Sequence, residues 1–204
     1  MRPGRENSVT GIVLGRELSG ERHWKLTLLS PDAGVVVCLW RVSRNPETDK
    51  PDLFDRAEIE LAGADGGVRF ANSYRVERRQ PTLGKDYQRL SLACRLAVLL
   101  ARNPPPEESA TGVFRLCETA LDALAERPFP AAAYCKFLWQ WMRMEGYPVR
   151  EQWLEELAEE KRRKAAVVLG SPLDQQPESA EEIAGLARSL ERWMAGECQF
   201  VLPD

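Results

Sequence analysis

The stretch HWKLTLLSPDAGVVVCLWRV (His23–Val42) decides the fold of the first part of the chain. Apolar and polar side chains alternate in both of its halves, which is the period of two expected of a half-buried strand. The residues that share the apolar faces are Trp24, Leu26 and Leu28, then Val36, Cys38, Trp40 and Val42. Between the halves, SPDAG (30–34) carries the Pro, Asp and Gly of a tight turn. The stretch therefore predicts two strands joined by a hairpin turn.

Three more strands are expected on either side of this hairpin. Their sequences are VTGIVL (9–14), LFDRAEIELA (53–62) and VRFANSYRVE (68–77), separated by a polar loop (43–52) and the turn GADGG. Five short strands in about 80 residues, joined by turns, are typical of a small barrel such as the OB-fold. We therefore expect an OB-fold domain over residues 1–80.

From residue 85 the apolar positions recur every three or four residues, which predicts helices. Prolines and glycines divide this part into five expected helices, over residues 85–103, 107–126, 131–145, 150–169 and 179–196. The predicted fold class is therefore α+β, with a five-stranded OB-fold barrel followed by an all-α domain over residues 81–204.

Composition argues against a strongly basic, a membrane-spanning or a secreted protein. The net charge is −3, and the acidic residues gather in the last quarter of the chain, so any basic surface must come from local clustering. No window approaches 18 uncharged apolar residues, and the start MRPGRENS has no apolar run after its arginines. We therefore expect a cytoplasmic protein with no membrane partner.

The sequence offers no pattern for catalysis or for a metal. His23 is the single histidine, and no Gly-x-Ser-x-Gly, Walker A or Gly-x-Gly-x-x-Gly motif occurs. The five cysteines are scattered and form no Cys-x-x-Cys pair, so we interpret them as buried thiols. We predict no catalytic residue, no metal site and no cofactor.

Nucleic-acid binding is the class that the barrel favours, because single-strand binders combine a cationic groove with aromatic stacking platforms. The candidate DNA-binding residues are Arg16, Arg22, His23, Lys25, Arg41, Arg44, Lys50 and Arg56. The barrel also holds the aromatic residues Trp24, Trp40, Phe70 and Tyr74. Each cation has an alternative interpretation as solvated surface, while Trp24 is expected in the core and Trp40 either in the core or exposed.

The run LEELAEEKRRK (154–164) places glutamates before cations at helical spacing. Glu159 with Arg163 and Glu160 with Lys164 form i,i+4 pairs in the favourable order. The run predicts an exposed helix that neutralises its own charge, with a phosphate contact as the alternative.

A tryptophan in the helical part is a candidate for partner binding. Trp139 and Trp141 are two positions apart, about 200° around a helix, so both cannot face one core. An exposed aromatic beside cations would suit an acidic peptide with an aromatic end. The candidate partner-binding residues are Arg127, Lys136, Trp139 and Arg143.

Over residues 8–150 the chain resembles the RecO family of DNA-repair proteins. The resemblance rests on TGIVLGRELSGERHWKLTLLSPDAG (10–34), LFDRAEIELA (53–62), VERRQPTLGKDYQRLSLACRLAVLLARN (76–103) and ALDALAERPFPAAAYCKFLWQWMRMEGYPV (120–149). It departs from many relatives in having fewer cations in CLWRVSRN, a short acidic C-terminal part and no four-cysteine zinc module after the Gly-Tyr-x-Pro turn.

The resemblance implies a non-enzymatic mediator of DNA repair and recombination after DNA damage. Such a protein binds single- and double-stranded DNA, anneals complementary strands and loads recombinase. It also implies two protein partners, RecR and the acidic C-terminal tail of the single-strand-binding protein. The family's DNA contacts transfer to Arg22, Lys25, Arg41 and Arg44. The alternative is a protein-interaction scaffold on an OB-fold that does not bind DNA, and the salt dependence of binding separates the two.

Overall fold

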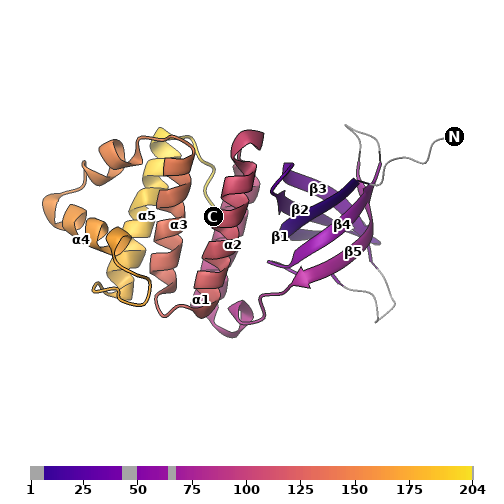
Figure 1. The fold of residues 1–204 in the computed structure, drawn as a ribbon, viewed down its shortest axis with the longest axis horizontal. Coiled ribbons are helices and arrows are strands. Elements are labelled where there is room, and N and C mark those ends of the chain that lie inside the picture. The colour runs from indigo at the N-terminus through magenta and orange to yellow at the C-terminus, as the bar shows by residue number, and fades with distance from the viewer. Residues whose placement is uncertain (1–6, 43–49, 64–67, 204) are drawn as a thin grey trace. The chain divides into compact units, whose positions relative to one another are not determined.

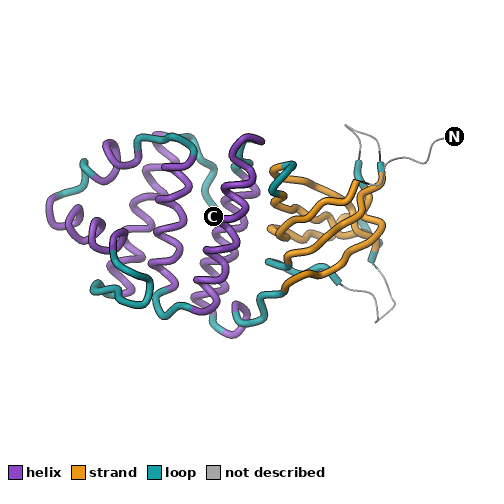
Figure 2. The backbone as a smooth tube through the Cα atoms, viewed as in Figure 1, coloured by secondary structure: helices purple, strands orange, loops and turns teal. Residues whose placement is uncertain are grey.

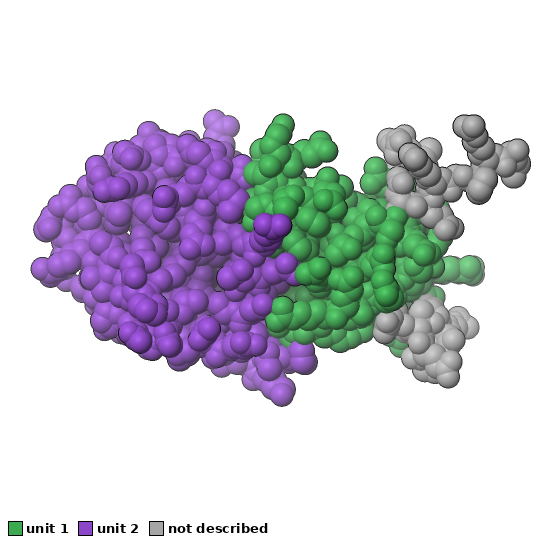
Figure 3. All heavy atoms as spheres, in the orientation of Figure 1, with its two compact units in different colours: residues 1–80, 104–114 green, residues 81–103, 115–204 purple. Residues whose placement is uncertain are grey.

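The computed structural model describes residues 7–42, 50–63 and 68–203. Figure 1 traces the fold, and Figure 2 shows that strands come first in the chain and helices afterwards. Two compact units are present, one of residues 1–80 with 104–114 and the other of residues 81–103 with 115–204 (Figure 3). One edge of this division lies after residue 80, and residues 104–114 belong to the first unit, so the units are not the two continuous segments that the sequence predicts.

The first unit contains a closed barrel whose strands follow the order β1-β2-β3-β5-β4. The strands are β1 (Asn7–Ser19), β2 (His23–Ser30), β3 (Gly34–Arg41), β4 (Arg56–Ala62) and β5 (Phe70–Arg78). Neighbouring strands are antiparallel, apart from a short parallel contact of β3 with β5 that closes the barrel. This five-stranded barrel confirms the predicted OB-fold.

Alternation along the strands builds the barrel core. Val36, Cys38 and Trp40 are buried, as their shared face predicts, and Leu26 and Leu28 lie opposite them on β2. Burying each of these larger aliphatic side chains contributes about 1.5–3 kcal/mol. The core interpretation of Trp40 is therefore correct, and the residues between these positions face outward.

Two strand boundaries differ most from the prediction. β1 runs to Ser19 rather than Leu14, because it pairs first with β4 and then, past a bulge near Val13, with β2. β4 begins at Arg56 rather than Leu53. Phe54 has a left-handed backbone with φ of 66°, is buried, and donates its N–H to the Val13 carbonyl, so it forms a turn.

The second unit is helical, with α2 shared between the two units. After a short 3-10 turn (Leu83–Lys85), the helices are α1 (Tyr87–Arg102), α2 (Glu107–Glu126), α3 (Pro130–Met144), a π-helical turn (Arg150–Leu154), α4 (Glu159–Gly170) and α5 (Ala180–Glu197). Asp86 caps α1 through its side chain, and Ser179 with Glu182 forms a capping box on α5. Gly146, with φ of 79°, follows the end of α3, as expected.

One helix prediction is wrong, since the expected helix over 150–169 is two elements. Trp153 turns inward, where its indole nitrogen donates to Ser189 Oγ at 3.3 Å, and the backbone becomes extended at Ala158 before α4 starts. Within α4, Lys164 pairs with Glu160 at 3.0 Å as predicted. Glu159 pairs with Arg162 rather than Arg163.

Among the described residues, none of the helices is both long and apolar enough to span a bilayer. The second unit instead buries its apolar faces internally. Tyr134, Phe137 and Trp141 of α3 are almost fully buried, as are Leu190 and Met194 of α5, and these two helices pack directly together. The packing of α3 against α5 therefore fixes the position of α3 up to its end before Gly146.

Candidate nucleic-acid interface

The outer face of β2 and β3 carries a cluster of aromatic, apolar and cationic side chains. Because Val36, Cys38 and Trp40 point into the barrel, Leu39 and Arg41 point outward. The strand register sets Arg41 opposite His23, and Leu39 opposite both Lys25 and Phe70. We call the outward cluster of His23, Val37, Leu39, Arg41 and Phe70 the platform.

Phe70 and His23 form the aromatic part of the platform. Their ring centroids are 6.0 Å apart and the rings meet edge to face. Phe70 is 44% exposed and Val37 is 48% exposed, which are large values for apolar side chains on a strand. Exposed aromatic faces beside cations are what a single-strand binder offers to unpaired bases.

Arg41 of the platform and the nearby Arg22 have guanidinium groups with no partner among the described residues. Arg41 at the end of β3 and Arg22 before β2 are exposed and form no hydrogen bond or ion pair with any residue that the structure describes. The two segments are tied together, since the Val42 N–H donates to the Arg22 carbonyl at 2.8 Å. Both cations are therefore available to phosphate.

Three other predicted cations, Lys25, Lys50 and Arg44, differ in what the structure shows of them. Lys25 pairs with Glu17 at 3.2 Å on the outer surface. Lys50 is exposed and has no partner among the residues described, while Arg44 lies outside the described residues.

Arg16 and Arg56 have structural contacts that their sequence positions did not predict. The Arg16 guanidinium lies over the Trp24 ring, 4.8 Å from its centroid, and donates to the Pro51 carbonyl at 2.6 Å. Arg56 pairs with Glu77 at 2.8 Å and lies over Phe114, 5.7 Å from the ring centroid. Both arginines thus hold segments of the first unit together, and Trp24 is partly buried against the core as expected.

Phe70 was not among the residues predicted to bind DNA. The sequence places it two residues after a glycine-rich turn, in a strand whose register with β3 is parallel and long-range. Alternation within β5 marks one face of that strand but does not reveal which strand lies beside it. Its neighbour His23 was predicted, and the contact between them comes from the barrel closure.

A buried carboxyl group lies at the start of β4. Asp55 Oδ2 accepts a hydrogen bond from the Tyr74 hydroxyl at 3.0 Å and pairs with Arg79 at 3.3 Å. Burial raises the pKa of the Asp55 carboxyl, and the hydrogen bonds and the charge of Arg79 offset this only in part. The same burial and the nearby carboxyl raise the pKa of Tyr74. The Asp55 carboxylate also accepts from the Asp52 backbone N–H, so the cluster fixes the turn before β4.

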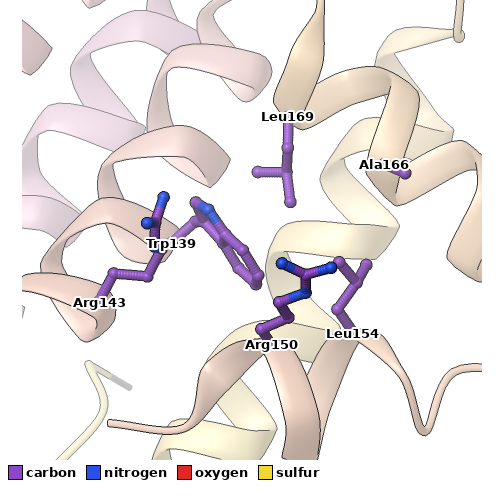
Figure 4. Close-up of a pocket in the computed structure, with 6 residues that line it drawn as sticks. All are labelled: Trp139, Arg143, Arg150, Leu154, Ala166 and Leu169. Carbon is purple, nitrogen blue, oxygen red and sulfur yellow. The ribbon is translucent and has the colours of Figure 1, made fainter. Parts of the chain in front are cut away.

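A second candidate site lies in the helical unit. A pocket with a volume of about 300 Å³ is lined by Trp139, Arg143, Arg150, Leu154, Ala166 and Leu169. Figure 4 shows the Trp139 ring between the guanidinium groups of Arg143 and Arg150. The Trp139 ring also contacts the Trp153 ring, and their centroids are 5.7 Å apart. We call this the Trp139 pocket.

The structure brings together two of the four predicted partner-binding residues, Trp139 and Arg143. Lys136 does not line the pocket. It is half-buried, and its ammonium donates to the Leu169 carbonyl at 3.2 Å and to the Ser171 carbonyl at the end of α4. Arg127 is exposed outside the lining, so the partner-binding roles of Lys136 and Arg127 stay predictions that this pocket does not support.

Arg150 and Leu154 were not predicted as pocket residues. Both belong to the π-helical turn, which brings them toward α3, and such turns often mark functional sites. The signal in the sequence was the helix terminator at Gly146 and Pro148, which separates the end of α3 at Met144 from the start of this turn at Arg150.

All five cysteines are free thiols, and Cys38, Cys117 and Cys135 are buried. Burial raises the pKa of Cys38 to about 11 and that of Cys135 to about 12, so both thiols are protonated at neutral pH. Within the part of the chain that the structure describes, no three His, Cys, Asp or Glu side chains gather where they could hold a metal ion.

Comparison of the sequence with protein-family models finds no match, and comparison with curated proteins finds none either. The function must therefore be argued from the platform and the Trp139 pocket.

Proposed function

We propose that this chain binds single-stranded nucleic acid through the platform, as a mediator of DNA repair and recombination of the RecO kind. The observation that carries the proposal is the contact of the exposed Phe70 with His23. Beside it lie Arg22 and Arg41, whose guanidinium groups have no partner among the described residues. The face formed by β2 and β3 is also where OB-folds bind oligonucleotides. Annealing of strands, duplex binding and recombinase loading extend the proposal.

The cationic and the aromatic side chains would contact different parts of the nucleic acid. The guanidinium groups attract the phosphate backbone, which gives affinity without sequence preference and makes binding fall with salt. The rings of Phe70 and His23 offer π-faces to unpaired bases, which a duplex keeps stacked inside. The platform therefore favours single strands over duplex.

Fluorescence anisotropy of a labelled oligothymidylate, titrated with the full chain at low and at physiological salt, tests the proposal. We expect salt-sensitive binding that Phe70→Ala and Arg41→Ala each weaken. Arg75→Ala is the matched control, because Arg75 is an exposed arginine of the same barrel that pairs with Glu58 away from the platform. The absence of binding at low salt would refute the proposal and favour the scaffold interpretation.

As a second candidate function, the Trp139 pocket suits an acidic peptide with an aromatic or aliphatic end. The pocket joins an apolar floor to two arginines, and Arg143 has no partner among the described residues. Carboxylates of the peptide would pair with the guanidinium groups while its apolar end fills the pocket. The resemblance gives the tail of the single-strand-binding protein as this peptide, and RecR as a further partner.

A labelled acidic nonapeptide that ends in Pro-Phe tests the pocket. Binding should be lost in Trp139→Ala and in Arg143→Glu, and it should be unchanged in Arg127→Glu, which alters an exposed arginine outside the lining. Equal binding by all four proteins would rule out this pocket as the docking site.

A further inference from the structure

The helical unit carries a third candidate site, and a segment of the chain itself fills it. After α5 ends at Glu197, residues 199–203 form neither helix nor strand and lie against the end of α1 and two aromatic rings. We call residues 199–203 the strap. The residues that hold it are Arg102, Asn103, Trp141 and Tyr147, which we call the Asn103 socket, and none of them lines the Trp139 pocket.

The Asn103 socket binds the main chain of the strap. Asn103 Oδ1 accepts a hydrogen bond from the Val201 N–H at 2.7 Å, and Asn103 Nδ2 donates to the Val201 carbonyl at 3.0 Å. Arg102 donates to the Leu202 carbonyl at 2.6 Å. Val201 itself is 54% exposed. Main-chain hydrogen bonds give affinity for extended peptides whatever their side chains, so the socket has the chemistry of peptide recognition.

One aromatic side chain anchors the strap. The Phe200 ring lies 5.1 Å from the Trp141 ring and 5.8 Å from the Tyr147 ring, measured between centroids, and it meets both edge to face. Edge-to-face contact is a favoured geometry of aromatic pairs. Trp141 is 1% exposed, so Phe200 rests on the core of the unit. The socket therefore selects for a phenylalanine one residue before the position that Asn103 binds.

The strap is held against local strain. Gln199 has φ of 59°, in the left-handed region that is costly for a residue with a Cβ atom. This conformation turns the chain back from the end of α5, where the Phe200 N–H donates to the Met194 carbonyl at 3.1 Å. A separate peptide can make the contacts of residues 200–203 without this turn. Release of the strap therefore relieves a strain that a peptide from another molecule does not carry.

We propose that the Asn103 socket is a peptide-binding site. The strap fills it in the free protein, and an extended segment of a partner protein, with a phenylalanine followed by apolar residues, displaces the strap. The apolar pattern is that of the strap itself, FVLP over residues 200–203. Because the strap is tethered, it competes at an effective concentration of roughly millimolar order. The intact chain should therefore bind a free copy of the strap weakly, and a weakened strap should leave the socket open to it.

The probe is a labelled pentapeptide, Gln-Phe-Val-Leu-Pro, with both ends blocked so that it has no charge. Phe200→Ala removes the anchor from the strap but leaves the socket intact, so this variant should bind the probe at least tenfold more tightly than the wild type in anisotropy titrations. Glu197→Ala, at an exposed position of α5 outside the socket, is the matched control and should bind as the wild type does. Equal binding by Phe200→Ala and the wild type, or no binding by Phe200→Ala, would overturn the proposal.

A second variant weakens the strap without touching its anchor. Val201→Pro removes the N–H that donates to Asn103 Oδ1, and it should also bind the probe at least tenfold more tightly than the wild type. Because Val201 is exposed, this change leaves the core intact and keeps the test decisive if Phe200→Ala unfolds. Circular dichroism checks that each variant is folded. Binding by a folded Val201→Pro no tighter than that of the wild type would contradict the proposal.

Further substitutions place the probe in the socket. In the Phe200→Ala background, Asn103→Ala should weaken binding at least tenfold, and so should alanine in place of the phenylalanine of the probe. Trp139→Ala in the same background should leave binding unchanged, since a loss would assign the probe to the Trp139 pocket and refute the proposal. Sedimentation should show the same mass for Phe200→Ala and the wild type. A wild-type dimer that Phe200→Ala abolishes would mean that the strap fills the socket of a second copy, against the proposal.

Discussion

The rings of His23 and Phe70 meet edge to face with their centroids 6.0 Å apart, although one residue opens β2 and the other opens β5. Barrel closure through the parallel contact of β3 and β5 brings them together. The pair forms an exposed aromatic surface at the place where an OB-fold binds oligonucleotides.

The first prediction concerns base stacking on this pair. Stacking on one aromatic side chain contributes about 1–3 kcal/mol per base, so Phe70→Ala should weaken oligothymidylate binding roughly tenfold or more. Phe70→Trp should keep the affinity, because it restores a π-face at the same position. Anisotropy titrations of both variants test this prediction. An equal loss of affinity in Phe70→Ala and Phe70→Trp would show that the shape of the Phe70 side chain, rather than stacking on its ring, determines binding.

Salt dependence gives the second prediction. Each phosphate contact with a single strand contributes about 0.7 to the slope of log affinity against log salt concentration. Arg22→Ala and Arg41→Ala should each lower the slope by about that amount, since both guanidinium groups are unoccupied among the described residues.

The matched control for the salt series is Arg75→Ala, and its slope should equal that of the wild type. Arg16→Ala should leave the slope unchanged but lower the unfolding midpoint, because Arg16 joins β1 to Pro51 and covers Trp24. If Arg16→Ala lowered the slope of log affinity against log salt concentration, Arg16 would be a phosphate contact after all.

The third prediction concerns the buried ion pair of the helical unit. Glu191 is 2% exposed and is held by Arg95 and by the Tyr134 hydroxyl at 2.6 Å. Removing one partner of a buried pair leaves a charge without compensation and costs about 3–5 kcal/mol. Arg95→Met should therefore lower the free energy of unfolding by about 3 kcal/mol, the lower end of this range, because the Arg95 side chain is about a third exposed.

Urea unfolding followed by circular dichroism measures this change. Arg188→Met is the control, since Arg188 is an exposed cation of α5 with no partner among the described residues, and it should change stability by about 0.5 kcal/mol at most. A similar small effect in Arg95→Met would mean that water compensates Glu191.

The fourth prediction is a pH dependence from Asp55. Its pKa is raised in the folded protein by burial, so the folded state binds the proton more tightly than the unfolded state does. The contribution of the protonated Asp55 carboxyl to the stability of the folded state is therefore fully present below its unfolded pKa, near 3.9. This contribution is lost as the pH rises through the folded pKa.

To isolate this group, the unfolding free energy of the wild type is compared with that of Asp55→Asn across the acidic range. The difference, wild type minus variant, should fall as the pH rises from the unfolded pKa of the carboxyl through its raised folded pKa. A difference that grew with pH would mean that the ion pair with Arg79 outweighs the burial of the carboxyl.

Local pattern was sufficient for much of the fold. Alternation through His23–Val42 predicted two strands and the inward face of Val36, Cys38 and Trp40. Proline and glycine breaks predicted α2 over Glu107–Glu126 and the end of α3 before Gly146. These features depend on neighbouring residues in the chain, which is why one sequence suffices.

Tertiary structure decided the candidate sites. The parallel register of β3 with β5 set Phe70 beside His23, and the inward turn of Trp153 broke one expected helix into the π-helical turn that lines the Trp139 pocket. It also decided that Arg16 and Arg56 contact protein whereas Arg22 and Arg41 stay unoccupied among the described residues. Periodicity reports which face of an element is apolar, but contacts between distant segments depend on how those faces pack, and the packing is set by the whole chain.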